Sequence, residues 1–189
     1  SASGELAPTN LPLLTAVVLI VAGLLFKLGV VPFHMWVPDV YDGSATSTTL
    51  FLSSVPKLAA FAIMLRLLAY GLGEWVSAWQ DMLAIAAVLS ISVGNIVAIA
   101  QTSLKRMLGY STISHMVFLL LGFLGGTAHG YSASLSYVVI YTVITLGAFG
   151  IILLLSKPQF EFDALSDLKG LNHSRPGLAF LMLIVMFSL

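Results

Sequence analysis

The chain has 189 residues, of which 59% are hydrophobic and only 8% are charged, against about 25% in an ordinary soluble domain. Its formal net charge is zero, so nothing points to nucleic acid as a partner. It contains no cysteine, which excludes thiolate-bound iron–sulfur clusters, zinc–cysteine sites and disulfides. This composition indicates an integral membrane protein whose surroundings are the lipid bilayer.

Long apolar runs follow one another along the chain. A bilayer core about 30 Å thick needs roughly 20 helical residues, and the runs are too evenly apolar for the alternating strands of a barrel. We therefore predict an all-α, polytopic transmembrane helix bundle with five full helices and a truncated sixth. The predicted ranges are about 11–34, 46–72, 82–100, 107–124, 133–155 and 177–189.

The ends of the chain lead us to expect one transmembrane domain, 1–189, that is a fragment of a longer protein. The chain begins with Ser1, lacks a signal-peptide pattern, and stops at Leu189 inside an apolar run.

The connectors predict the orientation. Loops around Glu5, 74–81 and His129 contain no lysine or arginine, whereas the other side carries Lys105, Arg106, Lys157, Lys169 and Arg175. The positive-inside rule places this second side in the cytoplasm. In the longest connector, 157–176, leucines at a spacing of three favour a short interfacial helix, with a docking surface for a neighbouring subunit as the alternative.

Three ionisable residues fall inside the predicted helices. At 1.5 Å per residue, Lys27 lies roughly 10 Å deep, Lys57 roughly 16 Å and His115 roughly 12 Å from the cytoplasmic ends. A buried lysine costs about 2.5–3.5 kcal/mol on insertion scales, so we expect these residues to be functional. The alternatives are a snorkelling side chain for Lys27 and a hydrogen-bonded packing role for His115.

The stretch FKLGVVPFHMWVPDVYDG, residues 26–43, combines the first of these lysines with a helix breaker. Pro32 lacks an amide hydrogen and clashes with the preceding turn, so we predict a helix break just past Lys27. Irregular backbone at depth is tolerated where it lines a cavity, and broken helices recur at ion sites of transporters. A simple kink is the alternative, and His34 fits a capping or interfacial role better than chemistry.

These groups suit proton transfer, because burial and nearby charges shift the proton affinity of lysine and histidine. No aspartate or glutamate lies inside a predicted helix. The compensating acid is therefore expected from a missing part of the chain or from another subunit. The sequence shows no phosphate-binding glycine loop and no zincin motif.

The stretch quoted above, with LFLSSVPKLAAFAIMLRLL, QTSLKRMLGYSTISHMVFLLLGF, TLGAFGIILLLSK and DLKGLNHSRPGLAFLMLIVMFSL, resembles the antiporter-like membrane subunit N of bacterial NADH:quinone oxidoreductase, respiratory complex I. The resemblance implies a 14-helix subunit built on two inverted five-helix repeats. This chain would supply its helices seven to eleven and the start of the twelfth, with the broken helix near Pro32.

The resemblance also implies residue roles. Lys27 would pair with a glutamate on an earlier helix, Lys57 would be the central proton-carrying lysine, and His115 would lie on the polar axis between two half-channels. The chain would be a translocase subunit of the bacterial inner membrane without a redox centre. NADH, FMN, iron–sulfur clusters and quinone would be bound by other subunits, and the other membrane subunits of complex I would be its partners.

Two other functions stay open. A subunit of a multisubunit cation/proton antiporter or of a membrane-bound hydrogenase shares the broken-helix lysine motif. A single-chain solute transporter, with Lys57 binding an anionic substrate, is the alternative from a different class.

Overall fold

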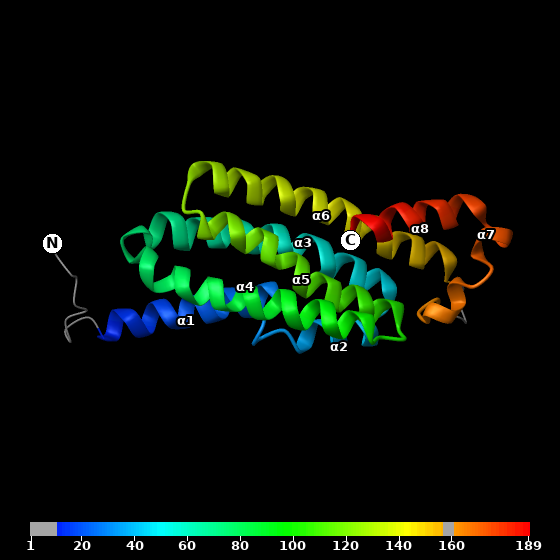
Figure 1. The fold of residues 1–189 in the computed structure, drawn as a ribbon, viewed down its shortest axis with the longest axis horizontal. Coiled ribbons are helices and arrows are strands. Elements are labelled where there is room, and N and C mark those ends of the chain that lie inside the picture. The colour runs from blue at the N-terminus through cyan, green and yellow to red at the C-terminus, as the bar shows by residue number, and fades with distance from the viewer. Residues whose placement is uncertain (1–10, 157–160) are drawn as a thin grey trace.

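The structure is a computed structural model that describes residues 11–156 and 161–189 as an elongated bundle of helices (Figure 1). Its elements are α1 (Leu11–Leu28), α2 (Trp36–Gly43), α3 (Thr46–Met64), a π-helical continuation (Leu65–Gly71), a 3₁₀ turn (Gly73–Trp75), α4 (Val76–Ile99), α5 (Leu104–Leu124), α6 (Ala128–Leu155), a second 3₁₀ turn (Leu165–Leu168), α7 (Leu171–Ser174) and α8 (Pro176–Ser188). Within the described residues no strand is present and five helices can cross a membrane. The predicted all-α fold class is confirmed.

The helices begin and end at residues that hydropathy alone does not mark. α1 ends at Leu28, so the predicted helix 11–34 is divided into α1 and an irregular stretch that leads to α2. α4, α5 and α6 begin earlier than predicted, at Val76, Leu104 and Ala128. Polar caps explain two of these starts, because the hydroxyl oxygens of Ser103 and Thr127 accept backbone N–H groups of the first turns of α5 and α6.

Helix α5 is the centre of the bundle. It packs along α4 and also contacts α2 and α6, while α3 packs along α6, and α1 lies against α3 and α4. Figure 1 shows α1 and α2 along one edge of the bundle and α6 and α8 along the opposite edge. The start of α3, the α4–α5 turn and the connector before α7 all lie at one end of the bundle.

The 161–175 connector differs from the predicted interfacial helix. It forms a 3₁₀ turn at Leu165–Leu168 and the single-turn helix α7, joined at Gly170. Gly170 adopts a left-handed conformation with φ of 80°, which side chains other than glycine rarely adopt. Gly170 therefore separates Leu171 from the turn that carries Leu165 and Leu168, so the three leucines do not lie on one continuous helix. Residues 157–160 of the predicted connector lie outside the described residues.

Close contact between α4 and α5 depends on Gly94. A Cβ added there would lie 2.9 Å from the backbone nitrogen of Ser114 and 3.0 Å from the carbonyl oxygen of Tyr110. Both atoms belong to the backbone of α5 and cannot rotate away. Small residues at helix interfaces allow such close approach in membranes.

We predict that Gly94→Ala destabilises the full-length protein by about 1–3 kcal/mol, because α4 and α5 must separate to admit the methyl group. Gly23→Ala on α1 is the matched control, since a Cβ there meets nothing within 4 Å. Thermal unfolding in detergent would measure both. Equal transition temperatures for the two variants would contradict the close contact.

Candidate functional site

The interruption after α1 is made by two residues. Gly29 has φ of 76°, and its N–H donates to the carbonyl of Phe26 at 3.0 Å, while the N–H of Val30 donates to the carbonyl of Leu25 at 3.2 Å. These bonds form a Schellman motif, which ends a helix at a left-handed glycine. Pro32 then supplies no N–H to the carbonyl of Leu28, four residues earlier. The break predicted near Pro32 is present, and Gly29 is the residue that ends α1.

The free carbonyl of Leu28 has a partner from another helix. The ammonium group of Lys57, on α3, donates to it across 2.7 Å, and the Lys57 side chain is only 1% exposed. Lys57 therefore takes the place of the amide that proline lacks. Because Leu28 directly follows Lys27, this bond brings the Lys57 ammonium to the backbone beside the first predicted lysine.

Two further residues enclose this contact. The Lys57 nitrogen lies 5.7 Å from the centroid of the Trp36 ring, a cation–π distance, and the Trp36 indole N–H donates to the carbonyl of Phe26 at 3.0 Å. On the other side, the N–H of Val31 donates to the hydroxyl oxygen of Ser90, on α4, at 2.8 Å. Thus α3, α4 and α2 together hold the broken segment in place.

The remaining predicted residues of the broken segment lie closer to the surface of the described chain. The Lys27 side chain is exposed and has no hydrogen bond or ion pair among the described residues, and Pro32 is exposed as well. His34 is half-buried, and its Nδ1 atom is buried without a partner in the described part of the chain. Buried polar atoms of this kind are normally satisfied by ordered water or by another chain.

His115 belongs to a separate polar cluster between α5 and α6. Its Nδ1 atom lies 2.6 Å from the hydroxyl of Tyr137, its Nε2 atom contacts the carbonyl oxygen of Leu189, and its ring lies 5.8 Å from that of Tyr141. The Tyr141 hydroxyl donates to Thr112 at 2.8 Å. No direct hydrogen bond joins this cluster to Lys57 in the described chain. The structure therefore brings Lys57 and the backbone beside Lys27 together, but leaves His115 apart from them.

Sequence reasoning missed several residues of this arrangement. Ser90 and Tyr137 carry no local motif, since their roles come from contacts with distant segments. Trp36 is not among the residues that the sequence predicts for the site, but its ring lies 5.7 Å from the Lys57 nitrogen. Lys105 was counted only as a cytoplasmic loop cation, but it is a residue of α5 with a 1% exposed side chain.

The described residues hold no cluster of three or more histidine or acidic side chains that could bind a metal ion.

Comparison with known proteins assigns the chain to a family. Residues 4–189 match the family described as NADH:quinone oxidoreductase/Mrp antiporter, TM. The chain is 60% identical over 180 residues to NADH-quinone oxidoreductase subunit N of Thiobacillus denitrificans, covering 95% of this chain and 37% of the relative. It is 49% identical to the protein of the same name from Coxiella burnetii, over 95% of this chain and 37% of the relative.

Solved structures agree in fold. A chain of respiratory complex I from Thermus thermophilus with bound aureothin aligns with a TM-score of 0.78 and 36% identity, covering all of this chain and 40% of its own length. A chain of an archaeal membrane-bound sulfane sulfur reductase aligns over 95% of this chain and 37% of its own length, with a TM-score of 0.73 and 22% identity, a likeness of fold alone.

The chain thus spans less than two-fifths of the length of the curated relatives it matches. The match nevertheless covers almost every residue of this chain, which confirms the resemblance inferred from the lysine and proline motifs. The chain belongs to the transmembrane family of NADH:quinone oxidoreductase and Mrp antiporter subunits.

Proposed function

We propose that this chain is part of a proton-translocating membrane subunit of NADH:quinone oxidoreductase. The observation that carries the proposal is the bond between the buried Lys57 ammonium and the Leu28 carbonyl that the helix break leaves free. A carbonyl dipole stabilises the ammonium without fixing it as an anion would. The cost of a buried charge therefore favours release of the proton once the surroundings change.

The neighbouring residues support a path on either side of Lys57. Lys27 directly precedes the residue that binds the Lys57 ammonium, which places its backbone beside that contact. His115, with the hydroxyl of Tyr137 at 2.6 Å, is a second exchangeable site. Ordered water is the expected link between these groups, and the unpartnered Nδ1 atom of His34 is a position for it.

The wider setting belongs to the same proposal. The relatives are subunits of NADH-quinone oxidoreductase by name, so we place NADH, FMN, iron–sulfur clusters and quinone on other subunits. Redox chemistry there would drive proton movement here. The chain would lie in the bacterial inner membrane beside the other membrane subunits of complex I, and the acid opposite Lys27 would come from outside the described residues.

The second candidate is a subunit of a multisubunit cation/proton antiporter, since the matched family is described by both activities. Flavin and iron–sulfur absorption in the complex that co-purifies with the full-length chain would favour the dehydrogenase. The solute transporter receives no support from the site, because the Lys57 ammonium is enclosed by Trp36 and the Leu28 carbonyl.

Lys57→Met is expected to abolish NADH-driven proton pumping while the subunit still assembles, because methionine fills the same space without a transferable proton. Pumping is measured as acidification of inverted membrane vesicles, and assembly as the amount of subunit in the purified complex. Full pumping by an assembled Lys57→Met complex would overturn the proposed function.

Ser90→Ala is expected to weaken the broken segment, because it leaves the Val31 N–H buried without a partner, at a cost of about 1–3 kcal/mol. We predict a lower thermal transition and slower pumping with an intact Lys57. Ser92→Ala is the matched control, since the Ser92 hydroxyl is exposed and bonds only to Val88 of its own helix. If both serine variants behave alike, Ser90 does not position the break.

A further inference from the structure

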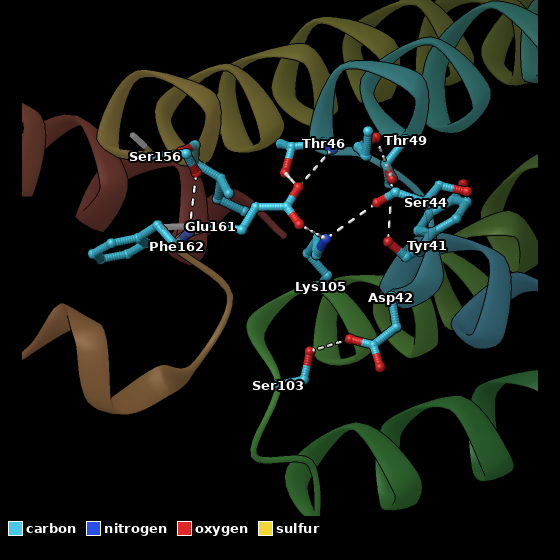
Figure 2. A network of polar contacts seen from close by, with 12 residues as sticks. Tyr41, Asp42, Ser44, Thr46, Thr49, Ser103, Lys105, Ser156, Glu161 and Phe162 are labelled. Atoms are coloured by element: carbon cyan, nitrogen blue, oxygen red, sulfur yellow. Dashed lines mark hydrogen bonds and ion pairs between the residues drawn. The ribbon is translucent and has the colours of Figure 1, made fainter. Parts of the chain in front are cut away.

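A second lysine is buried at the end of the bundle where α3 and α5 begin. The Lys105 side chain is 1% exposed, and its ammonium lies 3.3 Å from a carboxylate oxygen of Glu161 and donates to the carbonyl of Ser44 at 3.2 Å. Figure 2 shows the Lys105 nitrogen between Glu161 and Ser44. This residue is therefore a paired internal cation and not a free loop charge.

The same carboxylate holds the start of α3. The other oxygen of Glu161 accepts the backbone N–H of Thr46 at 3.0 Å and its hydroxyl at 2.7 Å. Thr46 is the first residue of α3, where the helix dipole favours an anion. These hydrogen bonds, chiefly that from the Thr46 hydroxyl, together with Lys105 hold the pKa of Glu161 below its usual value. The carboxyl group is therefore ionised at neutral pH.

The position of Lys105 makes this anion necessary. Lys105 lies in the first turn of α5, at the positive end of the helix dipole, where a cation is unfavourable. A buried cation without a counter-charge is strongly destabilising. Glu161 itself is 44% exposed, so it can be hydrated without Lys105, whereas Lys105 cannot be hydrated without a rearrangement of the helices.

Backbone bonds attach the connector to the same place. The N–H of Leu104 donates to the carbonyl of Asp163 at 2.6 Å, and the N–H of Leu165 donates to the carbonyl of Thr102 at 3.0 Å. Together they make an antiparallel bridge between Ser103 and Ala164. Ser103 also donates to Asp42 of α2 at 2.6 Å, as Figure 2 shows. The connector, the α4–α5 turn and the end of α2 are thus one hydrogen-bonded unit.

We propose that Glu161 is a positioning residue for the proton path, which fixes the starts of α3 and α5 to one point through Lys105 and Thr46. Lys57 on α3 and His115 on α5 each lie roughly three helical turns from this point. The pair therefore fixes the axial relation of the two helices that carry these side chains. This inference rests on the proposed function.

The test uses the full-length chain in its complex, in inverted membrane vesicles. It compares Glu161→Gln, Lys105→Met, the double variant, Asp163→Asn as the matched control and Lys57→Met as the reference for lost pumping. Asp163 is the control because it is a nearby acid whose side chain makes no hydrogen bond or ion pair among the described residues. The measurements are protons pumped per NADH oxidised and hydrogen exchange of the backbone amides of 161–168.

Glu161→Gln is expected to lower pumping roughly three- to tenfold and to speed amide exchange in 161–168 about tenfold, because Lys105 is left buried and unpaired. Lys105→Met is expected to be milder, since the exposed Glu161 keeps its bonds to Thr46. The double variant should recover to about half of normal pumping or more, because no unpaired charge remains buried. Asp163→Asn should match the unaltered protein.

Two results from assembled complexes would overturn the inference. Unchanged pumping and unchanged amide exchange in Glu161→Gln would mean that the Lys105–Glu161 pair does not fix the starts of α3 and α5. A double variant as inactive as Lys57→Met would make Lys105 a proton carrier and not part of a positioning pair. If Glu161→Gln does not assemble, assembly of the double variant supports the inference, and its absence opposes it. Full pumping by Lys57→Met would instead refute the proposed function, whatever the exchange data show.

Discussion

The arrangement of the site depends on the hydrogen bond between the Lys57 ammonium and the Leu28 carbonyl. Proline at position 32 removes the amide that would pair with this carbonyl, and Gly29 turns the chain away at the same point. An unpaired carbonyl inside a membrane costs several kcal/mol, and so does an unpaired ammonium. Each group lowers the cost of the other, so the helix break and the lysine stabilise each other.

The sequence predicted the parts of this structure that depend on composition and on single residues. Evenly apolar runs predicted the number of membrane-spanning helices, and Pro32 predicted a break. The starts of α5 and α6 are predicted too late, because their caps Ser103 and Thr127 lie in connectors. A hydropathy average over many residues does not reveal the position of a single polar cap. The sequence assigns the helix break to proline alone. A glycine in a sequence does not reveal that its φ angle is positive; the Schellman hydrogen bonds around Gly29 show this only in the structure.

The rest of the site depends on contacts between residues far apart in the chain. Ser90 lies 59 positions from Val31, and Thr46 lies 115 positions from Glu161, so no local pattern connects them. Lys105 shows the consequence most clearly. The positive-inside rule counts a lysine near a helix start as an exposed loop charge. Lys105 is instead buried and paired with Glu161. The connector supplies the acid that pairs with Lys105, whereas Lys57 has no acidic partner among the described residues.

The two buried lysines differ in their partners and not in their burial. Both side chains are 1% exposed. Lys105 faces the carboxylate of Glu161, one oxygen of which lies 3.3 Å from the ammonium. Among the described residues, Lys57 donates to a carbonyl oxygen, lies over an aromatic ring and forms no ion pair. A fixed counter-charge therefore suits a residue that holds helices in place. A neutral partner agrees with the proton-carrying role proposed for Lys57.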